Sequence, residues 1–108
     1  MSRYQLHLHT RALAGQEEAY HRWYDEVHIA EVLGLDGFLS GERFEPVPLA
    51  PDAPPPDGYL AIYEIETDDV GALLQQLNTG KMDISPALDT GNVRTALYRT
   101  ITPRVVAR

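Results

Sequence analysis

The pattern of apolar and polar positions predicts four strands and two helices in the order β-α-β-β-α-β. The first predicted strand covers residues 3–10, where the side chains alternate between two faces. One face carries Tyr4, Leu6 and Leu8, and the other carries Gln5, His7 and His9. Residues 59–66 (YLAIYEIE) give the strongest strand signal, because they are rich in β-branched and aromatic residues. Looser alternation predicts strands at 37–47 and 93–102.

Helical spacing predicts two helices between these strands. The first follows Ala14-Gly15 and runs to about Leu33, without proline or interior glycine. Its apolar face is expected to carry Tyr20, Trp23, Tyr24, Val27 and Ala30. Gly34 is expected to end it in the left-handed conformation. Thr67-Asp68-Asp69 forms an N-cap signature for the second helix, which closes at Asn78-Thr79-Gly80. Its apolar positions are Val70, Leu73, Leu74 and Leu77.

Two segments lack a regular pattern. Residues 48–58 (PLAPDAPPPDG) hold five prolines in eleven positions, so they can neither continue a helix nor supply the hydrogen bonds of a sheet. We expect an exposed connector between two strands. Residues 81–92 form a looser stretch before the last strand. At 108 residues the chain has room for one hydrophobic core, which predicts a single domain over 1–108.

This element order is the split βαβ arrangement, an α+β fold with a four-stranded antiparallel sheet and both helices on one face. The other face of the sheet is left bare. Leucine, isoleucine, tyrosine and valine side chains are available to bury that face against a second copy. The sequence therefore predicts a homodimer.

Composition excludes several kinds of partner and cofactor. The net charge of -7 disfavours nucleic acid and anionic membranes as partners. The chain has no cysteine, so disulfides, iron-sulfur clusters and thiolate zinc sites are excluded. The first residues do not resemble a signal peptide, and no apolar run approaches the 18 residues of a membrane span. We expect a cytoplasmic protein.

The side chains best suited to catalysis lie in the first predicted helix. The segment 23–28 (WYDEVH) gathers an indole, a phenol, a carboxylate and an imidazole within two turns. In an α-helix, Tyr24 and Asp25 are both within reach of His28. An aspartate that holds one imidazole nitrogen raises the basicity of the other, which favours His28 as a general base. The alternative is an ordinary solvated helix face.

Other candidates have structural alternatives as well. Trp23 pins the helix to the sheet or walls a pocket. His7 and His9 share one strand face and point into a cavity or onto the dimer surface, and a metal site there would need a third ligand. Arg43 forms a surface ion pair or holds a substrate oxyanion. Tyr63 packs in the core or lines a pocket. Glycine-rich nucleotide loops and hydrolase motifs are absent from the sequence.

The run EEAYHRWYDEVHIAEVLGLDGFLSGERF, followed by YLAIYEIE, SPALD and ALYRTI, resembles the EthD-like family of the dimeric α+β barrel superfamily. The family pattern maps onto Trp23, Tyr24, Asp25, His28, Gly37-Phe38 and Arg43-Phe44. Asp36 replaces the usual proline, and Ile29-Ala30 replaces the usual Leu-Pro. The resemblance implies a ferredoxin-like monomer that pairs through its sheet, with an apolar cavity between sheet and helices.

Three functional hypotheses follow. The first is a cofactor-independent enzyme of the cyclase, isomerase, lyase or monooxygenase type. It would bind a hydrophobic, aromatic or carbonyl-bearing molecule, with His28, Asp25 and Tyr24 catalytic. Its substrate-binding residues would be Trp23, His7, His9, Arg43, Tyr63 and Phe38. The second is a non-catalytic ligand-binding dimer of a catabolic or biosynthetic pathway. The third is a haem or metal enzyme with His7, His9 or His28 as ligand.

Overall fold

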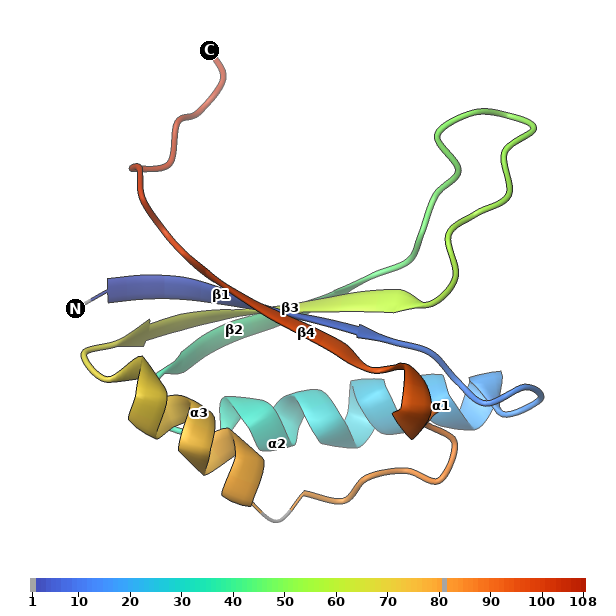
Figure 1. Cartoon of the computed structure of the whole chain (residues 1–108), viewed down its shortest axis with the longest axis horizontal. Coiled ribbons are helices and arrows are strands. Elements are labelled where there is room, and N and C mark those ends of the chain that lie inside the picture. Colours follow the sequence, from blue (N-terminus) through green and yellow to red (C-terminus); the bar gives the residue numbers. More distant parts are fainter. Residues whose placement is uncertain (1, 81) are drawn as a thin grey trace.

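The computed structural model describes residues 2–80 and 82–108, and Lys81 of the predicted loose stretch lies outside them. One antiparallel sheet has the strand order β2-β3-β1-β4, and the helices gather on one of its faces (Figure 1). The predicted α+β fold is confirmed. The elements are β1 (Ser2–Thr10), α1 (Glu17–Trp23), η1 (Tyr24–His28), α2 (Ile29–Leu33), β2 (Phe38–Phe44), β3 (Tyr59–Thr67), α3 (Val70–Thr79), η2 (Thr90–Asn92) and β4 (Arg94–Arg99).

The first predicted helix contains a π-helical turn that its sequence does not announce. Segments α1, η1 and α2 form one continuous helix, and in η1 the Ile29 N–H donates to the carbonyl of Tyr24, five residues earlier. The wider turn changes which residues face the sheet. Val27, expected on the apolar face, is 38% exposed, and Ala30 is exposed as well. The buried residues of this helix are Tyr20, Tyr24 and Val32.

The hydrophobic core lies between this helix and one face of the sheet. On that face Leu6 of β1 stands opposite Tyr63 of β3, and Tyr4 stands opposite Ile65. Leu6, Tyr63 and Ile65 have no exposed surface. Because side chains alternate along a strand, these pairs fix the helix-facing side of both strands.

The outer face of the sheet carries the opposite set of side chains. His7 stands opposite Ile62 there, and His9 stands opposite Leu60. The helices leave this face uncovered (Figure 1). It mixes apolar and polar groups, and its other members include Gln5, Glu42, Phe44, Glu64 and Tyr98.

The ends of several elements differ from the predictions. Gly34 does not adopt the left-handed conformation, since its φ is -75° and its ψ is -10°. In the turn between α2 and β2, Gly37 is left-handed instead, with φ +92°, and a Cβ there would lie 2.6 Å from Leu73 Cδ1. The predicted N-cap Asp69 is confirmed, because it accepts a hydrogen bond from the Ala72 N–H at 3.0 Å. Strand β4 stops at Arg99, before the predicted end at 102.

Two arms extend from the sheet on the side away from the helices. They are the proline-rich β2-β3 connection and the chain after β4 (Figure 1). The radius of gyration of 15.3 Å exceeds the value of about 13 Å expected for a compact chain of this length. The second arm exposes Ile101, Val105 and Val106. No helix in the described residues is long and apolar enough to span a membrane.

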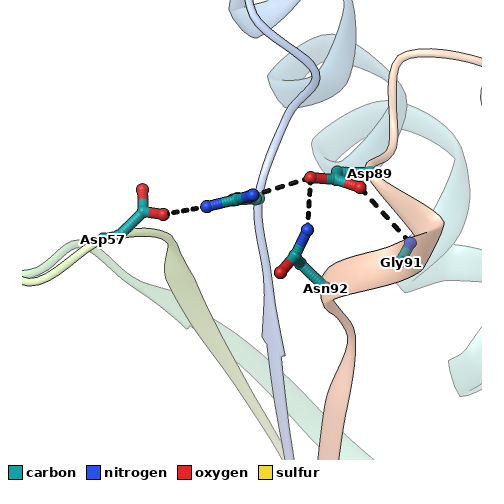
Figure 2. Close-up of polar contacts among 5 residues, drawn as sticks. Asp57, Asp89, Gly91 and Asn92 are labelled. Atoms are coloured by element: carbon teal, nitrogen blue, oxygen red, sulfur yellow. Dashed lines mark hydrogen bonds and ion pairs between the residues drawn. The ribbon is translucent and has the colours of Figure 1, made fainter.

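The base of the proline-rich arm is tied to the body of the protein by Arg11. This guanidinium donates to Asp57 at the end of the arm and to Asp89 beside η2, the latter at 2.9 Å (Figure 2). Asp89 also accepts from Asn92 at 2.7 Å. Its hydrogen bonds from Arg11 and Asn92 lower the pKa of Asp89. These contacts join three segments that are distant in sequence.

Candidate functional site

The π-helical turn brings the two rings of Trp23 and His28 together. Their centroids are 4.6 Å apart, and their planes differ by 25°, which is a stacked arrangement. In a regular α-helix, residues five apart point about 140° away from each other, so this stack could not form. The stack of Trp23 and His28 forms because the π-helical turn η1 contains one residue more than an α-helical turn.

His28 is partly buried and carries an unsatisfied polar atom. Its Nδ1 is buried and has no hydrogen-bond partner among the described residues. Burial lowers the pKa of His28 below its usual value of 6.5, and the nearby Glu31 carboxylate partly opposes this. At neutral pH the ring is therefore an uncharged imidazole, which is the form that can accept a proton.

The connector after α3 crosses the helix at this point. The Trp23 indole Nε1 donates to the Asp83 carbonyl at 2.6 Å, and the Asp83 N–H donates to Glu31 Oε2 at 3.3 Å. The two partners of Asp83 lie on either side of His28 along the helix. The other carboxylate oxygen of Glu31, Oε1, is buried without a partner among residues 2–80 and 82–108. The connector thus lies across the helix segment that carries His28.

Asp25 does not support His28, contrary to the expected pairing. Its Oδ1 instead accepts a hydrogen bond from Arg43 of β2 at 2.7 Å. Among the described residues, no hydrogen bond joins Asp25 to His28. The expectation assumed α-helical spacing, and the π-helical turn between these residues alters it. Asp25 therefore positions Arg43.

Tyr24 contacts both His28 and Arg43. Its ring meets His28 in a T-shaped contact at 5.1 Å, and the Arg43 guanidinium lies 4.4 Å from its centroid. Burial, and then the neighbouring Tyr20, raise the pKa of Tyr24 to about 12, although Arg43 opposes the shift. The phenol stays protonated at neutral pH, so it can donate a hydrogen bond but cannot act as a base.

Tyr63 and Phe38, two predicted substrate-binding residues, lie in the core. Their rings form a T-shaped pair at 6.0 Å. The Tyr63 hydroxyl is buried, and burial raises its pKa, with the neighbouring Tyr24 adding to the shift. Together with Tyr20 and Tyr24, these rings occupy the space where the resemblance implies a cavity.

His7 and His9 lie on the outer face of the sheet, away from the helices and from His28. His7 Nε2 is 3.1 Å from Gln5 Oε1, and its ring is 4.8 Å from that of Tyr98. Partial burial, and then His9, lower the pKa of His7. Within the described part of the chain, no group of three or more His, Cys, Asp or Glu side chains is placed to hold a metal ion.

No protein family model and no curated protein matches the sequence. Solved structures do match it. A candidate monooxygenase from Shewanella loihica PV-4 shares 19% identity with a TM-score of 0.57, over 95% of this chain and 99% of that one. A variant of MhuD with two manganese protoporphyrin IX molecules bound per active site shares 12% identity with a TM-score of 0.60, over 95% and 99%. In fold, the chain is a ferredoxin-like α+β protein.

A third ferredoxin-like neighbour is a candidate antibiotic biosynthesis monooxygenase from Bacillus cereus. It shares 11% identity with a TM-score of 0.53, over 99% of this chain and 98% of that one. At such low identities the likeness establishes the fold and not the reaction. The fold agrees with the resemblance drawn from the sequence, whereas the EthD-like family itself remains a prediction.

Sequence reasoning missed two features of this region. The π-helical turn has no proline or glycine to signal it, and every residue of YDEVH is compatible with an α-helix. The helical pattern places His21 on a polar helix face, yet its Nδ1 lies 3.1 Å from Arg43 Nη2. A contact between a helix and a strand 22 residues later leaves no local pattern to detect.

Proposed function

We propose that the protein is an enzyme that binds a small aromatic or carbonyl-bearing molecule beside His28 and removes a proton from it. The observation that carries this proposal is the π-helical turn that stacks His28 on Trp23 and leaves its Nδ1 buried and unpartnered among the described residues. An unsatisfied buried polar atom costs about 1–3 kcal/mol of folding free energy, and a role in binding a ligand would explain why it is retained. π-Helical turns are frequent at functional sites.

The proposed chemical step is general base catalysis. His28 Nδ1 accepts a proton from a C–H bond next to a carbonyl, or from a phenolic O–H. The electron pair of the broken bond stays on the substrate as an enolate or phenolate, and the imidazole becomes an imidazolium. Glu31 lies close enough to stabilise that positive charge. The resulting anion is the reactive species for isomerisation, cyclisation, bond cleavage or reaction with oxygen, which keeps all four reaction types open.

The substrate would bind under the connector that Asp83 fastens to the helix. Trp23 offers a flat aromatic surface there and lies in direct contact with His28. His7 and His9 lie on the other side of the sheet, so they are not part of this site as we propose it. Arg43 contacts Tyr24 and is separated from His28 by that ring, which leaves the oxyanion to be stabilised by other donors.

Isotope exchange tests the proton-removal step by itself, whichever reaction follows it. Aryl methyl ketones and phenols are incubated with the protein in D2O, and uptake of deuterium at carbon is followed by NMR. The wild type should accelerate exchange for at least one compound, and His28→Phe should reduce the rate by a factor of about 10²–10⁴. His9→Phe, which changes an imidazole on the outer sheet face, serves as the matched control and should leave the rate unchanged.

A second candidate function is ligand binding without catalysis. It is favoured by the close packing of Tyr20, Tyr24 and Tyr63 between helix and sheet, since these rings leave little room for a substrate to rearrange. In that case a compound would bind saturably near Trp23, and no exchange would be observed. Saturable binding with equal exchange rates in the wild type and His28→Phe would favour this function.

We also propose that two copies associate through the outer face of the sheet, as the EthD-like resemblance implies. Phe44 is 40% exposed and Tyr98 is 56% exposed there, and Leu60 and Ile62 between them are only half-buried. The two arms rise on the same side (Figure 1), where they would flank a partner sheet. Burial of this face would add apolar contact area that a 108-residue monomer lacks.

A further inference from the structure

A pocket lies at the end of β2, apart from His28. It has a volume of about 400 Å³ and combines residues from α1, η1, β2 and the start of β3. Its lining consists of His21, Asp25, Arg43, Phe44, Glu45 and Tyr59. Volumes of this size are typical of sites for small ligands. His28, Trp23 and Glu31 are not among its lining residues, so this pocket is distinct from the site proposed above.

Arg43 is held rigidly in this pocket. Its side chain is 14% exposed, and the guanidinium lies over the Tyr24 ring at 4.4 Å. Nη1 donates to Asp25 at 2.7 Å, and Nη2 lies 3.1 Å from His21 Nδ1. A guanidinium has five N–H donors and no acceptor, so three of them are not used by these two bonds. A fixed cation with spare donors suits an oxygen acceptor on a ligand.

The contact with Arg43 determines the tautomer of His21. The guanidinium can only donate, so His21 Nδ1 must accept, and the ring proton must lie on Nε2. Protonation of Nδ1 would place two donors against each other. The His21 ring is also held in a T-shaped contact with Tyr59 at 4.5 Å. His21 Nε2–H is therefore a second, oriented donor.

The charges of the pocket identify the ligand class. Arg43 is already paired with Asp25, and Glu45 adds a further carboxylate to the lining. This balance disfavours a ligand with a full negative charge. The donors still require an acceptor, and the ring of Tyr59, which contacts His21, offers aromatic contact. We propose that this pocket binds a small, uncharged aromatic molecule through a carbonyl or phenolic oxygen, which accepts hydrogen bonds from Arg43 and His21.

Titration with two matched probes tests the proposal. 4-Hydroxyacetophenone and 4-hydroxybenzoate differ in whether the ring bears a neutral ketone or a carboxylate. At about pH 7, the ketone should produce saturable chemical-shift changes in protein spectra at His21 and Tyr59, and the carboxylate should bind more weakly. His21→Phe keeps a ring beside Tyr59 but removes the Nε2–H donor. It should weaken ketone binding about tenfold.

A separate variant distinguishes this pocket from the proposed active site. His28→Phe should leave ketone binding at His21 unchanged, even if it abolishes isotope exchange. The proposal is overturned if the ketone does not bind at His21, if the carboxylate binds as tightly as the ketone, or if His21→Phe binds the ketone with wild-type affinity. Loss of ketone binding in His28→Phe would also overturn it, because the ligand would then occupy the His28 site.

Discussion

At the scale of single residues, two buried polar atoms of the long helix have no hydrogen-bond partner among the described residues: His28 Nδ1 and Glu31 Oε1. Buried polar groups are nearly always hydrogen-bonded, so each is costly to maintain. His28 and Glu31 belong to neighbouring turns of one helix, beneath the same connector. Their proximity suggests that a ligand or an ordered water completes their hydrogen bonds, and this is the basis of the proposed site.

The lowered pKa of His28 predicts a dependence of stability on pH. The folded state favours the neutral ring, whereas the unfolded ring titrates near 6.5. The contribution of neutral His28 to the free energy of unfolding should therefore be fully present above about pH 6.5. It should be lost as the pH falls toward the lower pKa that His28 has in the folded state. Urea unfolding at a fixed protein concentration, compared at several pH values from 5 to 8, measures this change.

His28→Phe should make this profile shallower, because it keeps a ring for the stack on Trp23 and removes one of the two histidines with a lowered pKa, the other being His7. At pH 7 the variant should be as stable as the wild type or more stable by about 1 kcal/mol, since an unsatisfied atom is lost. Gln75→Ala changes an exposed side chain of α3 and leaves all four histidines in place, so it is the control and should retain the wild-type profile. A His28→Phe protein that loses stability in acid as steeply as the wild type would show that burial of this ring is not the cause.

At the scale of secondary structure, the π-helical turn is the feature that organises the site. Such a turn contains one residue more than an α-helical turn. Insertion of one alanine after the exposed residue Glu26 should therefore place Trp23 and His28 six residues apart, on different sides of the helix, and break the stack. Glu26→Ala, which keeps the chain length, should preserve the stack.

Trp23 is the only tryptophan in the chain, so its fluorescence reports the stack directly. The insertion after Glu26 should keep the helical circular dichroism spectrum but should change the emission of Trp23 and remove its dependence on pH between 5 and 8. Glu26→Ala should match the wild type in both respects. An unchanged, pH-dependent emission in the folded insertion variant would contradict the assigned role of the turn.

The elements themselves were largely predictable from sequence, and the site was not. The alternation in residues 3–10 correctly placed Tyr4 and Leu6 on one face of a strand, and residues 59–66 were correctly predicted as a strand, but the pattern did not show which face meets the helices. The pairing of Asp25 with His28 was wrong because it assumed 3.6 residues per turn. The π-helical turn, the Asp83 contacts and the His21–Arg43 contact depend on tertiary packing, which local spacing does not encode.

At the scale of the whole molecule, the shape of the chain argues for a partner. An uncovered sheet face and two arms with exposed apolar side chains make the monomer less compact than chains of its length usually are. Sedimentation at micromolar concentration should show a species of twice the monomer mass of 12.1 kDa.

A charge in the centre of the outer sheet face should prevent this association. Ile62→Lys places an ammonium opposite His7 on the outer face and should yield monomers. Glu26→Gln, which also raises the net charge by one unit but at an exposed position on the helix, should remain dimeric. A wild-type protein that sediments only at the monomer mass would refute the dimer.

The acid dependence of isotope exchange tests the central claim, that neutral His28 is the base. Exchange into a responsive ketone or phenol is followed by NMR across pH 4 to 8 in the wild type and in His28→Phe. The wild-type rate should fall in acid with a midpoint below 6.5, because the base is lost when its lowered pKa is crossed. His28→Phe should show neither the accelerated exchange nor its decrease at acid pH. Exchange that persists in His28→Phe with the same profile would show that another group removes the proton.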